Sequence, residues 1–213
     1  MRVSGLWQQP TAARACLVLA HGAGAGMRHP FMSAVAAALA ERAIATLRYQ
    51  FPYMERAGRR PDPPQLCYAT VRAAVATAVS LAPQLPLFAG GKSFGGRMTS
   101  QATAESPLPT VSGLVFLGFP LHAPGNPGDA RGEHLGRLRL PMLFLQGTRD
   151  AFAELGLLQG LIERLSARAT LKLFEEADHS FHVPARSGRT DQQVLAELAD
   201  TSAAWMLATA EQR

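Results

Sequence analysis

The sequence has few cysteines and no long hydrophobic run, and both absences restrict the class of protein to which it can belong. Its two cysteines, Cys16 and Cys67, form no C-x-x-C pair and have no histidine at metal-ligand spacing, so no disulfide framework and no metal site are expected. No apolar stretch approaches the roughly 18–20 residues that cross a bilayer. The apolar run at residues 16–20 is shorter than the core of a signal peptide, about 7–15 residues. We therefore expect a soluble, cytoplasmic protein with reduced thiols and no membrane partner.

Charged residues are also sparse, at 17% of the chain, and acidic residues are fewer than basic residues. Lysine and arginine number 21 against 16 aspartates and glutamates, which gives a net charge of +5. The basic residues do not gather in one stripe with interleaved aromatic residues, so the sequence predicts no nucleic-acid partner. With 47% hydrophobic residues, the 213 residues suffice to bury the core of one domain that spans residues 1–213.

Short apolar runs alternate with helical patterns along the whole chain. The expected strands are residues 16–20, 45–49, 85–90, 112–117, 141–146 and 170–174, and the pattern also allows a strand at residues 3–7. The expected helices are residues 29–42, 64–82, 94–105, 152–166 and 191–210. Strand alternating with helix predicts an α/β fold, with a mostly parallel sheet of about six strands and helices on both faces. Ligands bind beyond the carboxyl ends of such strands, so the residues that follow each strand are the candidates for chemistry.

A G-x-S-x-G pattern, Gly91-Lys92-Ser93-Phe94-Gly95, lies between the third of these strands and a helix. A serine on so sharp a turn is held in a strained backbone conformation, and small residues on either side let the two arms of the turn approach. The N-terminus of the following helix favours negative charge that develops beside the serine. In this context the pattern predicts that Ser93 is a nucleophile.

Asp150 follows the fifth predicted strand and His179 follows the sixth, so a serine, an aspartate and a histidine each come after a different strand. In a catalytic triad the histidine takes the serine proton, and the aspartate orients the imidazole ring. Asp150 could instead cap the helix expected near residue 152. Asp178 is a competing carboxylate, although its position next to His179 makes the Nδ1 atom of that ring hard to reach. His182 is the main rival of His179 among the six histidines.

A second glycine-rich turn, residues 21–26, follows the first clear strand. A tetrahedral intermediate needs two N–H donors aimed at one oxygen. We expect one donor to be the main-chain N–H of Phe94 and the other to be that of Ala23, with Gly24 as the alternative. Glycines allow the main chain to turn inward there without a Cβ clash, although a plain flexible turn has a similar composition.

Glycine-rich loops after strands also occur in nucleotide-binding proteins, and particular residues exclude that interpretation. A phosphate-binding G-x-x-x-x-G-K-S loop would end at residues 91–93, but the position of its first glycine is Pro86. The dinucleotide pattern G-x-G-x-x-G, begun at Gly22, would place its last glycine at Met27. The second strand also ends at residues 48–50 without an acidic residue for a ribose hydroxyl.

Together these motifs resemble the compact, lidless α/β-hydrolases related to dienelactone hydrolases and small carboxylesterases, in particular a group of bacterial α/β-hydrolase-like proteins. The matching segments are residues 21–26, 29–32, 51–55, 91–96, 118–122, 146–152 and 178–181, which span almost the whole chain. Each segment alone is unspecific, but the set is specific. The resemblance implies an α/β-hydrolase fold with Ser93, Asp150 and His179 as the triad. It predicts the fold and the mechanism more strongly than it predicts the substrate.

Lid domains of this fold lie in the connection that corresponds to residues 118–140. Its 23 residues can hold one short helix and a loop, so we expect a shallow, open pocket with no separate lid. By position, the expected substrate-binding residues are Tyr53, Phe119 and His122, with Met54, Phe152 and Phe181 as further wall candidates. Arg48, Arg59, Arg60 and Arg97 could attract an anionic acyl group, although solvated surface arginines are the more common case.

The sequence thus predicts a serine hydrolase that cleaves a small ester or related acyl bond through an acyl-Ser93 intermediate, without a metal or organic cofactor. Short-chain esters are the expected substrates, and thioesters, lactones and small amides are alternatives. The second hypothesis is a catalytically silent hydrolase fold that acts in binding or regulation. A missing triad residue would have favoured this second hypothesis, and none is missing.

Overall fold

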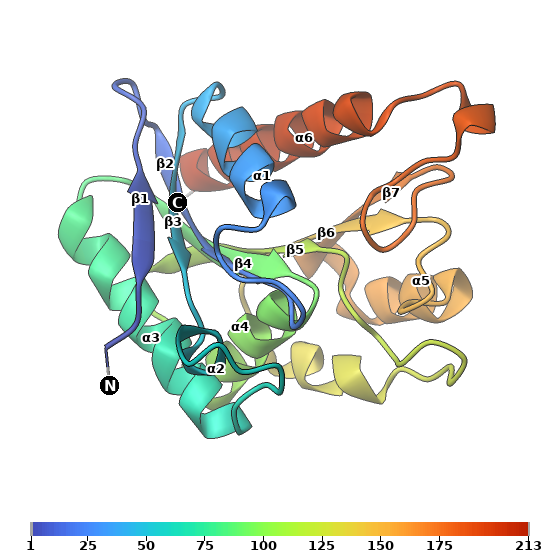
Figure 1. Ribbon diagram of the computed structural model, residues 1–213, viewed down its shortest axis with the longest axis horizontal. Helices are drawn as coiled ribbons and strands as arrows, with labels where there is room; N and C mark the ends of the chain where they lie inside the picture. The colour runs from blue at the N-terminus through green and yellow to red at the C-terminus, as the bar shows by residue number, and fades with distance from the viewer. Residues whose placement is uncertain (1, 213) are drawn as a thin grey trace.

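The computed structural model describes residues 2–212, which contain a seven-stranded sheet in the order β1-β3-β2-β4-β5-β6-β7 (Figure 1). The strands are β1 (Gly5–Gln8), β2 (Ala15–Ala20), β3 (Ile44–Tyr49), β4 (Leu87–Lys92), β5 (Val111–Leu117), β6 (Met142–Gly147) and β7 (Ala169–Phe174). Strands β2 to β7 are parallel, and β1 pairs antiparallel with β3 at one edge. The carboxyl ends of six strands therefore meet at the same side of the sheet, where ligands bind in such folds.

Helices cover both faces of the sheet. They are α1 (Pro30–Ala40), α2 (Pro52–Glu55), α3 (Pro64–Leu81), α4 (Phe94–Glu105), α5 (Leu155–Leu165) and α6 (Asp191–Glu211), with the 3-10 helices η1 (Ala130–Arg137), η2 (Ser166–Arg168) and η3 (Ala185–Ser187). α1 and α6 lie on one face, and α3, α4 and α5 lie on the other (Figure 1). In β2, Cys16 and Val18 join the core beneath α3 and α4, whereas Leu17 and Leu19 join the core beneath α1 and α6. Burial on both faces explains the continuous apolar runs of the strands.

Local signals begin the helices that flank the sheet. α3 begins at Pro64, whose fixed φ suits the first position of a helix, and Val71, Val75 and Ala78 recur along its buried face. α6 begins with a capping box, in which the side chains of Thr190 and Gln193 each accept a hydrogen bond from the main-chain N–H of the other. These signals fix where both helices begin.

The α/β fold predicted from the sequence is confirmed, with strand ends shifted by one or two residues. The strand that the pattern allowed at residues 3–7 is present as β1, so the sheet has seven strands rather than about six. β1 is a four-residue edge strand without a fully buried residue, which is why its hydrophobic pattern is weak. The short helix α2 was not predicted, because four residues are too few to show a helical period.

The connection at residues 118–140 contains η1 and no other helix. η1 packs against α4 at the edge of the site, so this stretch forms part of the wall rather than a separate lid. Among residues 2–212, no helix combines the length and the hydropathy that a bilayer crossing requires.

Candidate active site

Ser93 lies at the junction of β4 and α4, with φ 49° and ψ −116°. A positive φ is rare for a residue with a side chain, and this strain is typical of a nucleophile presented on a strand-to-helix turn. The N–H of Ser93 donates to the carbonyl of Leu117 over 3.1 Å, and its carbonyl accepts from the N–H of Arg97 over 3.1 Å. These two main-chain bonds anchor the turn to β5 and to α4.

Close approach of the backbone explains the glycines around Ser93. A Cβ atom at Gly91 would lie 2.3 Å from the carbonyl oxygen of Ala20, and one at Gly95 would lie 2.5 Å from that of His21. Both glycines therefore make room for the end of β2, a reason that the sequence did not reveal. The two arms of the turn approach each other at Gly96 instead, where a Cβ atom would lie 2.8 Å from the Gly91 carbonyl oxygen.

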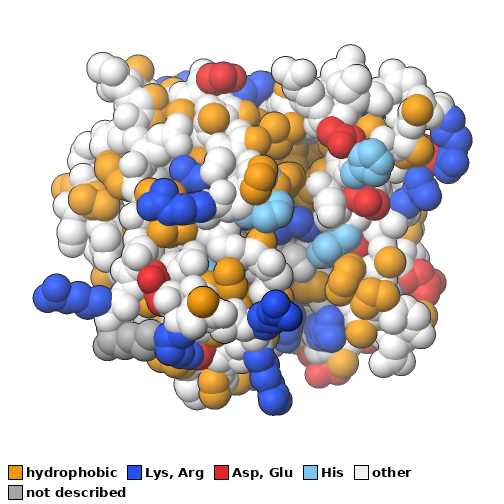
Figure 2. All heavy atoms as spheres, in the orientation of Figure 1, with side chains coloured by type: hydrophobic (Ala, Val, Ile, Leu, Met, Phe, Trp, Pro, Cys, Tyr) orange, Lys and Arg blue, Asp and Glu red, His pale blue; other side chains and the backbone are white. Residues whose placement is uncertain are grey.

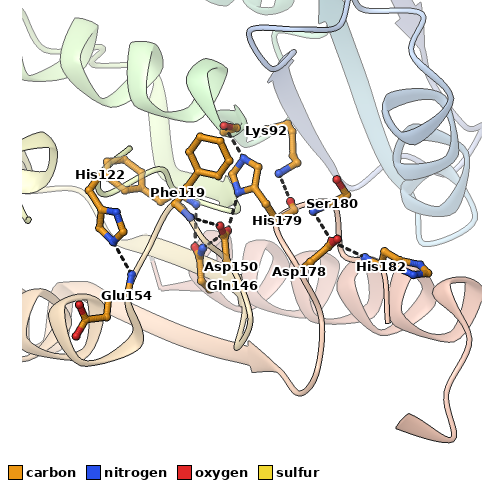
Figure 3. Close-up of polar contacts among 12 residues, drawn as sticks. Lys92, Phe119, His122, Gln146, Asp150, Glu154, Asp178, His179, Ser180 and His182 are labelled. Atoms are coloured by element: carbon orange, nitrogen blue, oxygen red, sulfur yellow. Dashed lines mark hydrogen bonds and ion pairs between the residues drawn. The ribbon is translucent and has the colours of Figure 1, made fainter. Parts of the chain in front are cut away.

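The structure brings Ser93, His179 and Asp150 together from the ends of β4, β7 and β6. Figure 3 shows the His179 ring beside the Asp150 carboxylate. The Oγ atom of Ser93 lies 2.8 Å from Nε2 of His179, and Nδ1 of His179 lies 2.6 Å from Oδ2 of Asp150. The Asp150 side chain is fully buried, and that of His179 is 20% exposed. A carboxylate at Nδ1 leaves Nε2 free to accept the serine proton.

A glutamine that sequence analysis missed holds Asp150 in place. Gln146 is fully buried in β6; its Nε2 group donates to Asp150, and its Oε1 atom accepts the N–H of Phe119 over 2.8 Å (Figure 3). The other oxygen of Asp150 accepts the N–H of Phe152 over 2.7 Å. This contact forms a turn before α5, which begins only at Leu155, so Asp150 does not cap that helix. The sequence signal that could have identified Gln146 is a glutamine in an otherwise apolar strand.

The rival residues face elsewhere. The Oδ1 atom of Asp178 accepts the N–H groups of Ser180 and His182, at 2.7 and 3.0 Å, and so shapes the loop that carries His179 (Figure 3). The ring of His182 is exposed and lies 2.9 Å from Asp191, whose carboxylate raises the His182 pKa. Neither residue contacts Ser93 or Asp150.

Lys92, directly before Ser93, points back into the site. Its ammonium group donates to the main-chain carbonyl of His179 (Figure 3) and lies 5.5 Å from the ring centroid of Phe181. Burial lowers the pKa of Lys92 to about 8, although the negative charges of Asp150 and Asp178 oppose the lowering. The sequence analysis gave Lys92 no role of its own. The signal that could have identified it is a charged residue at the end of an otherwise apolar strand.

The loop after β2 is held firmly beside Ser93. Nδ1 of His21 donates to the carbonyl of Gly22 over 2.8 Å, and its Nε2 accepts the N–H of Phe51 over 3.0 Å. Burial lowers the pKa of His21, which favours the neutral ring that both bonds require. The hydroxyl of Tyr53 donates to the carbonyl of Ala23 over 2.7 Å. The peptides on both sides of Ala23 are thus fixed. Ala23 lines the same cavity as Ser93 and Phe94, the first residue of α4.

A cavity of about 380 Å³ opens over Ser93 and His179, and we call it the first cavity. Its lining includes the loop of residues 22–25 together with His29, Phe31, Met32, Lys92, Phe152 and Ser180. Figure 2 shows a hollow in the middle of this face, with hydrophobic walls and histidine side chains beside it. The Phe152 ring packs on the His179 ring with centroids 4.3 Å apart, which restrains the imidazole.

The structure does not place the three expected substrate-binding residues on the cavity wall. Tyr53 and Phe119 are buried, at 2% and 0% exposure, because their rings pack into the core. His122 uses both ring nitrogens locally: Nδ1 donates to the carbonyl of Ala123, and Nε2 accepts the N–H of Glu154 (Figure 3). These expectations were wrong because a position after a strand does not fix the direction of the side chain. Phe152 does line the cavity.

The arginines considered in the sequence separate into different roles. Arg48 is largely buried and donates to Ser33 and to the carbonyl of Met27. Arg59 and Arg60 are not among the cavity-lining residues, whereas Arg97 lines a second cavity beside Ser93. Within residues 2–212, no group of three or more histidine, cysteine or acidic side chains could hold a metal ion.

Comparison with known proteins identifies the fold. Dienelactone hydrolase from Anabaena variabilis is 21% identical, with a TM-score of 0.77 over 98% of this chain and 92% of that chain. An α/β serine hydrolase without a lid from Xanthomonas campestris is 19% identical, with a TM-score of 0.73 over 95% and 89%. A monoacylglycerol lipase from Paleococcus ferrophilus is 15% identical, with a TM-score of 0.73 over 98% and 100%.

The family match is more extensive than any single motif. Residues 13–207 match the family described as Alpha/beta hydrolase domain. The match includes every strand from β2 to β7 and all three residues of the Ser93–His179–Asp150 arrangement. The resemblance inferred from the motifs is confirmed: the chain belongs to the α/β-hydrolase family.

Proposed function

We propose that the chain is a serine hydrolase that cleaves small esters or related acyl bonds through an acyl-Ser93 intermediate. The observation that carries the proposal is the unbroken line of hydrogen bonds from Ser93 through His179 to Asp150. Each bond is within the distance needed for proton transfer or for orientation of the ring. The strained turn presents Ser93 at an open cavity rather than inside the core.

The reaction follows from these contacts. Ser93 Oγ attacks the acyl carbon while His179 accepts its proton, and Asp150 stabilises the resulting imidazolium. His179 then gives the proton to the leaving oxygen as the acyl–oxygen bond of the substrate breaks. Water attacks the acyl-Ser93 ester with His179 as the base, which releases the acid and restores the serine. All groups in these steps belong to the chain, the substrate or water.

Two main-chain N–H groups would hold the oxyanion, those of Phe94 and Ala23. Phe94 is the first residue of α4, where helical N–H groups lack a partner within the helix and the helix dipole favours negative charge. The bond from His21 to the Gly22 carbonyl keeps in place the peptide that carries the Ala23 N–H before substrate arrives. Donors fixed in advance contribute several kcal/mol, about 2.7–4 for one donor in a serine protease of another fold.

The test compares hydrolysis of 4-nitrophenyl acetate and butyrate by the wild type, Ser93→Ala and Ser80→Ala. Ser80 is an exposed serine of α3, remote from the site, and so provides a matched control. We expect Ser93→Ala to lower kcat by at least about 10⁴-fold, as loss of a triad serine does elsewhere, and Ser80→Ala to keep full activity. A folded wild type without activity toward any acyl substrate would favour the silent hydrolase fold.

A further inference from the structure

A second cavity, of about 370 Å³, borders Ser93 on the side of α4, and we call it the arginine cavity. It shares Ala23, Ser93 and Phe152 with the first cavity, and its own lining includes Arg97 and Arg131. A substrate bound at Ser93 would therefore extend one of its ends toward two guanidinium groups.

Neither arginine has an acidic partner among residues 2–212. No ion pair of Arg97 or Arg131 occurs in this part of the chain, and the Nε atom of Arg97 is buried without a hydrogen-bond partner. The Arg97 guanidinium lies 5.9 Å from the ring centroid of Phe94. Burial lowers the pKa of Arg97, and the positive charge of Arg131 lowers it further. An anion between the two guanidinium groups would offset their mutual repulsion.

Asp62 is the acidic residue of the arginine cavity, and its carboxylate is already occupied. Its Oδ1 atom pairs with Arg56, and its Oδ2 atom accepts the N–H of Tyr53 over 2.6 Å. The Asp62 side chain is 5% exposed. Asp62 thus stabilises α2 and does not neutralise Arg97 or Arg131.

The two arginines are carried by elements that are bonded to each other. The Oγ atom of Ser100 on α4 lies 3.0 Å from the carbonyl oxygen of Arg97 and 2.7 Å from Nε2 of His134 on η1. Burial lowers the pKa of His134 to about 4, so its ring is neutral at pH 7. This buried pair fixes η1, and with it Arg131, against α4. Buried hydrogen bonds therefore hold the two arginines in one cavity wall.

We propose that Arg97 and Arg131 bind a free carboxylate on the substrate, so that the enzyme prefers small esters that carry one. The inference rests on the proposed function and names its substrate class. Arg97 follows Ser93 by four residues, about 6 Å along α4. The carboxylate then lies a few bonds from the scissile carbonyl, as in monoesters of short dicarboxylic acids.

A carboxylate suits this cavity better than a phosphate does. Guanidinium groups bind either anion through paired N–H donors. Pro61, Pro64, Met98 and Pro120 form much of the remaining wall and offer no side-chain donor for a third anionic oxygen. Each oxygen of a carboxylate can accept two N–H donors, so both guanidinium groups can bind it, and the Asp62 carboxylate in the same lining repels one negative charge less than the two of a phosphate.

The kinetic test compares 4-nitrophenyl hemiglutarate with the neutral 4-nitrophenyl valerate, which has the same chain length without the charge. We expect the wild type to prefer the charged ester. Arg97→Gln and Arg131→Gln should each lower kcat/KM for it by about 10–100-fold, the range for one hydrogen bond to a charged group, and should lower kcat/KM for the valerate much less. Arg137→Gln is the control, since Arg137 is an exposed arginine of η1 outside this cavity. Equal losses for both esters, or a wild-type preference for valerate, would overturn the proposal.

A binding test separates this proposal from the hydrolase proposal. Monomethyl glutarate is titrated into the Ser93→Ala protein by calorimetry, with dimethyl glutarate as the neutral comparison. Binding of the monoester alone, lost when Arg97→Gln is added, supports the carboxylate site even if no ester is turned over. Absence of binding overturns the site, whereas failure of the hydrolase proposal shows as a wild type that cleaves neither ester.

Discussion

Lys92 and His179 are 87 residues apart in the chain, and the Lys92 ammonium group donates a hydrogen bond to the main-chain carbonyl of His179. The bond ties the loop after β7 to the strand that presents Ser93. Lys92→Met removes the donor, so we expect the position of the His179 ring to become less defined. The result should be a fall in kcat of about 10–100-fold, the range for a charge-assisted bond, with a smaller change in KM. Lys172→Met is the matched control, because Lys172 pairs with Glu197 of α6 and is not among the residues that line the first cavity. A Lys92→Met enzyme as active as this control would contradict the positioning role.

The same lysine predicts a pH dependence. Its pKa in the folded protein is about 8, below the ordinary 10.5, so the ammonium group loses its proton as pH rises through about 8. The hydrogen bond to His179 is then no longer charge-assisted, and kcat should fall through that range in the wild type but not in Lys92→Met.

The same pKa difference predicts how stability depends on pH. The unfolded chain keeps the Lys92 proton up to about pH 10.5, so between pH 8 and 10.5 this group makes the free energy of unfolding rise with pH. Urea midpoints of both proteins at pH 7, 9 and 10 measure this second effect; parallel curves for the two proteins would contradict it.

Asp150 and Asp178 can be told apart by amide substitution. Asp150→Asn replaces the carboxylate that faces His179 Nδ1, and we expect kcat to fall by about 10⁴-fold, as in a related triad. Asp178→Asn keeps an oxygen that can accept the N–H groups of Ser180 and His182 and should leave kcat within a few-fold. Steady-state kinetics on both variants settle the assignment, and the reverse order of effects would make Asp178 the functional acid.

Gln146 supports Asp150 from inside the sheet. Gln146→Leu leaves the buried main-chain N–H of Phe119 without a partner and removes one of the two hydrogen bonds at Oδ2 of Asp150, the other being that from His179. We expect a loss of about 1–3 kcal/mol in unfolding free energy for the unpaired N–H group, together with a lower kcat. Denaturant unfolding measures the first effect, with Gln159→Leu on the exposed side of α5 as the control. Equal stability of the two variants would show that Gln146 does not have this role.

The glycines near Ser93 differ sharply in their need for space. A Cβ atom at Gly95 would lie 2.5 Å from a main-chain oxygen that cannot move without displacing β2, whereas one at Gly24 meets no atom within 4 Å. Gly95→Ala should therefore destabilise the protein by more than about 3 kcal/mol, in the range of severe backbone or packing strain. Gly24→Ala should unfold at the wild-type denaturant concentration. Similar midpoints for Gly95→Ala and the wild type would contradict the close approach to β2.

The sequence predicted the sheet and the positions of Ser93, Asp150 and His179 because both depend on where apolar runs end. Parallel strands bring their carboxyl ends to one side, so residues far apart in the chain meet there without further information. Tyr53, Phe119 and His122 were misplaced because side-chain direction depends on packing against α3, α4 and the loop before α5. Lys92 and Gln146 were missed because hydrogen bonds between elements leave no period in the sequence. The arginine cavity depends on η1 lying against α4, which only the folded structure reveals.

The most direct test of the account is the intact mass of the protein after treatment with a fluorophosphonate, for the wild type, Ser93→Ala and Asp150→Asn. The reagent is attacked only by an activated serine, so it requires no knowledge of the substrate. We predict a single adduct on the wild type, none on Ser93→Ala and slow labelling of Asp150→Asn. An unlabelled wild type that is folded, or equal labelling of the wild type and Ser93→Ala, would contradict the assignment of Ser93 as the nucleophile.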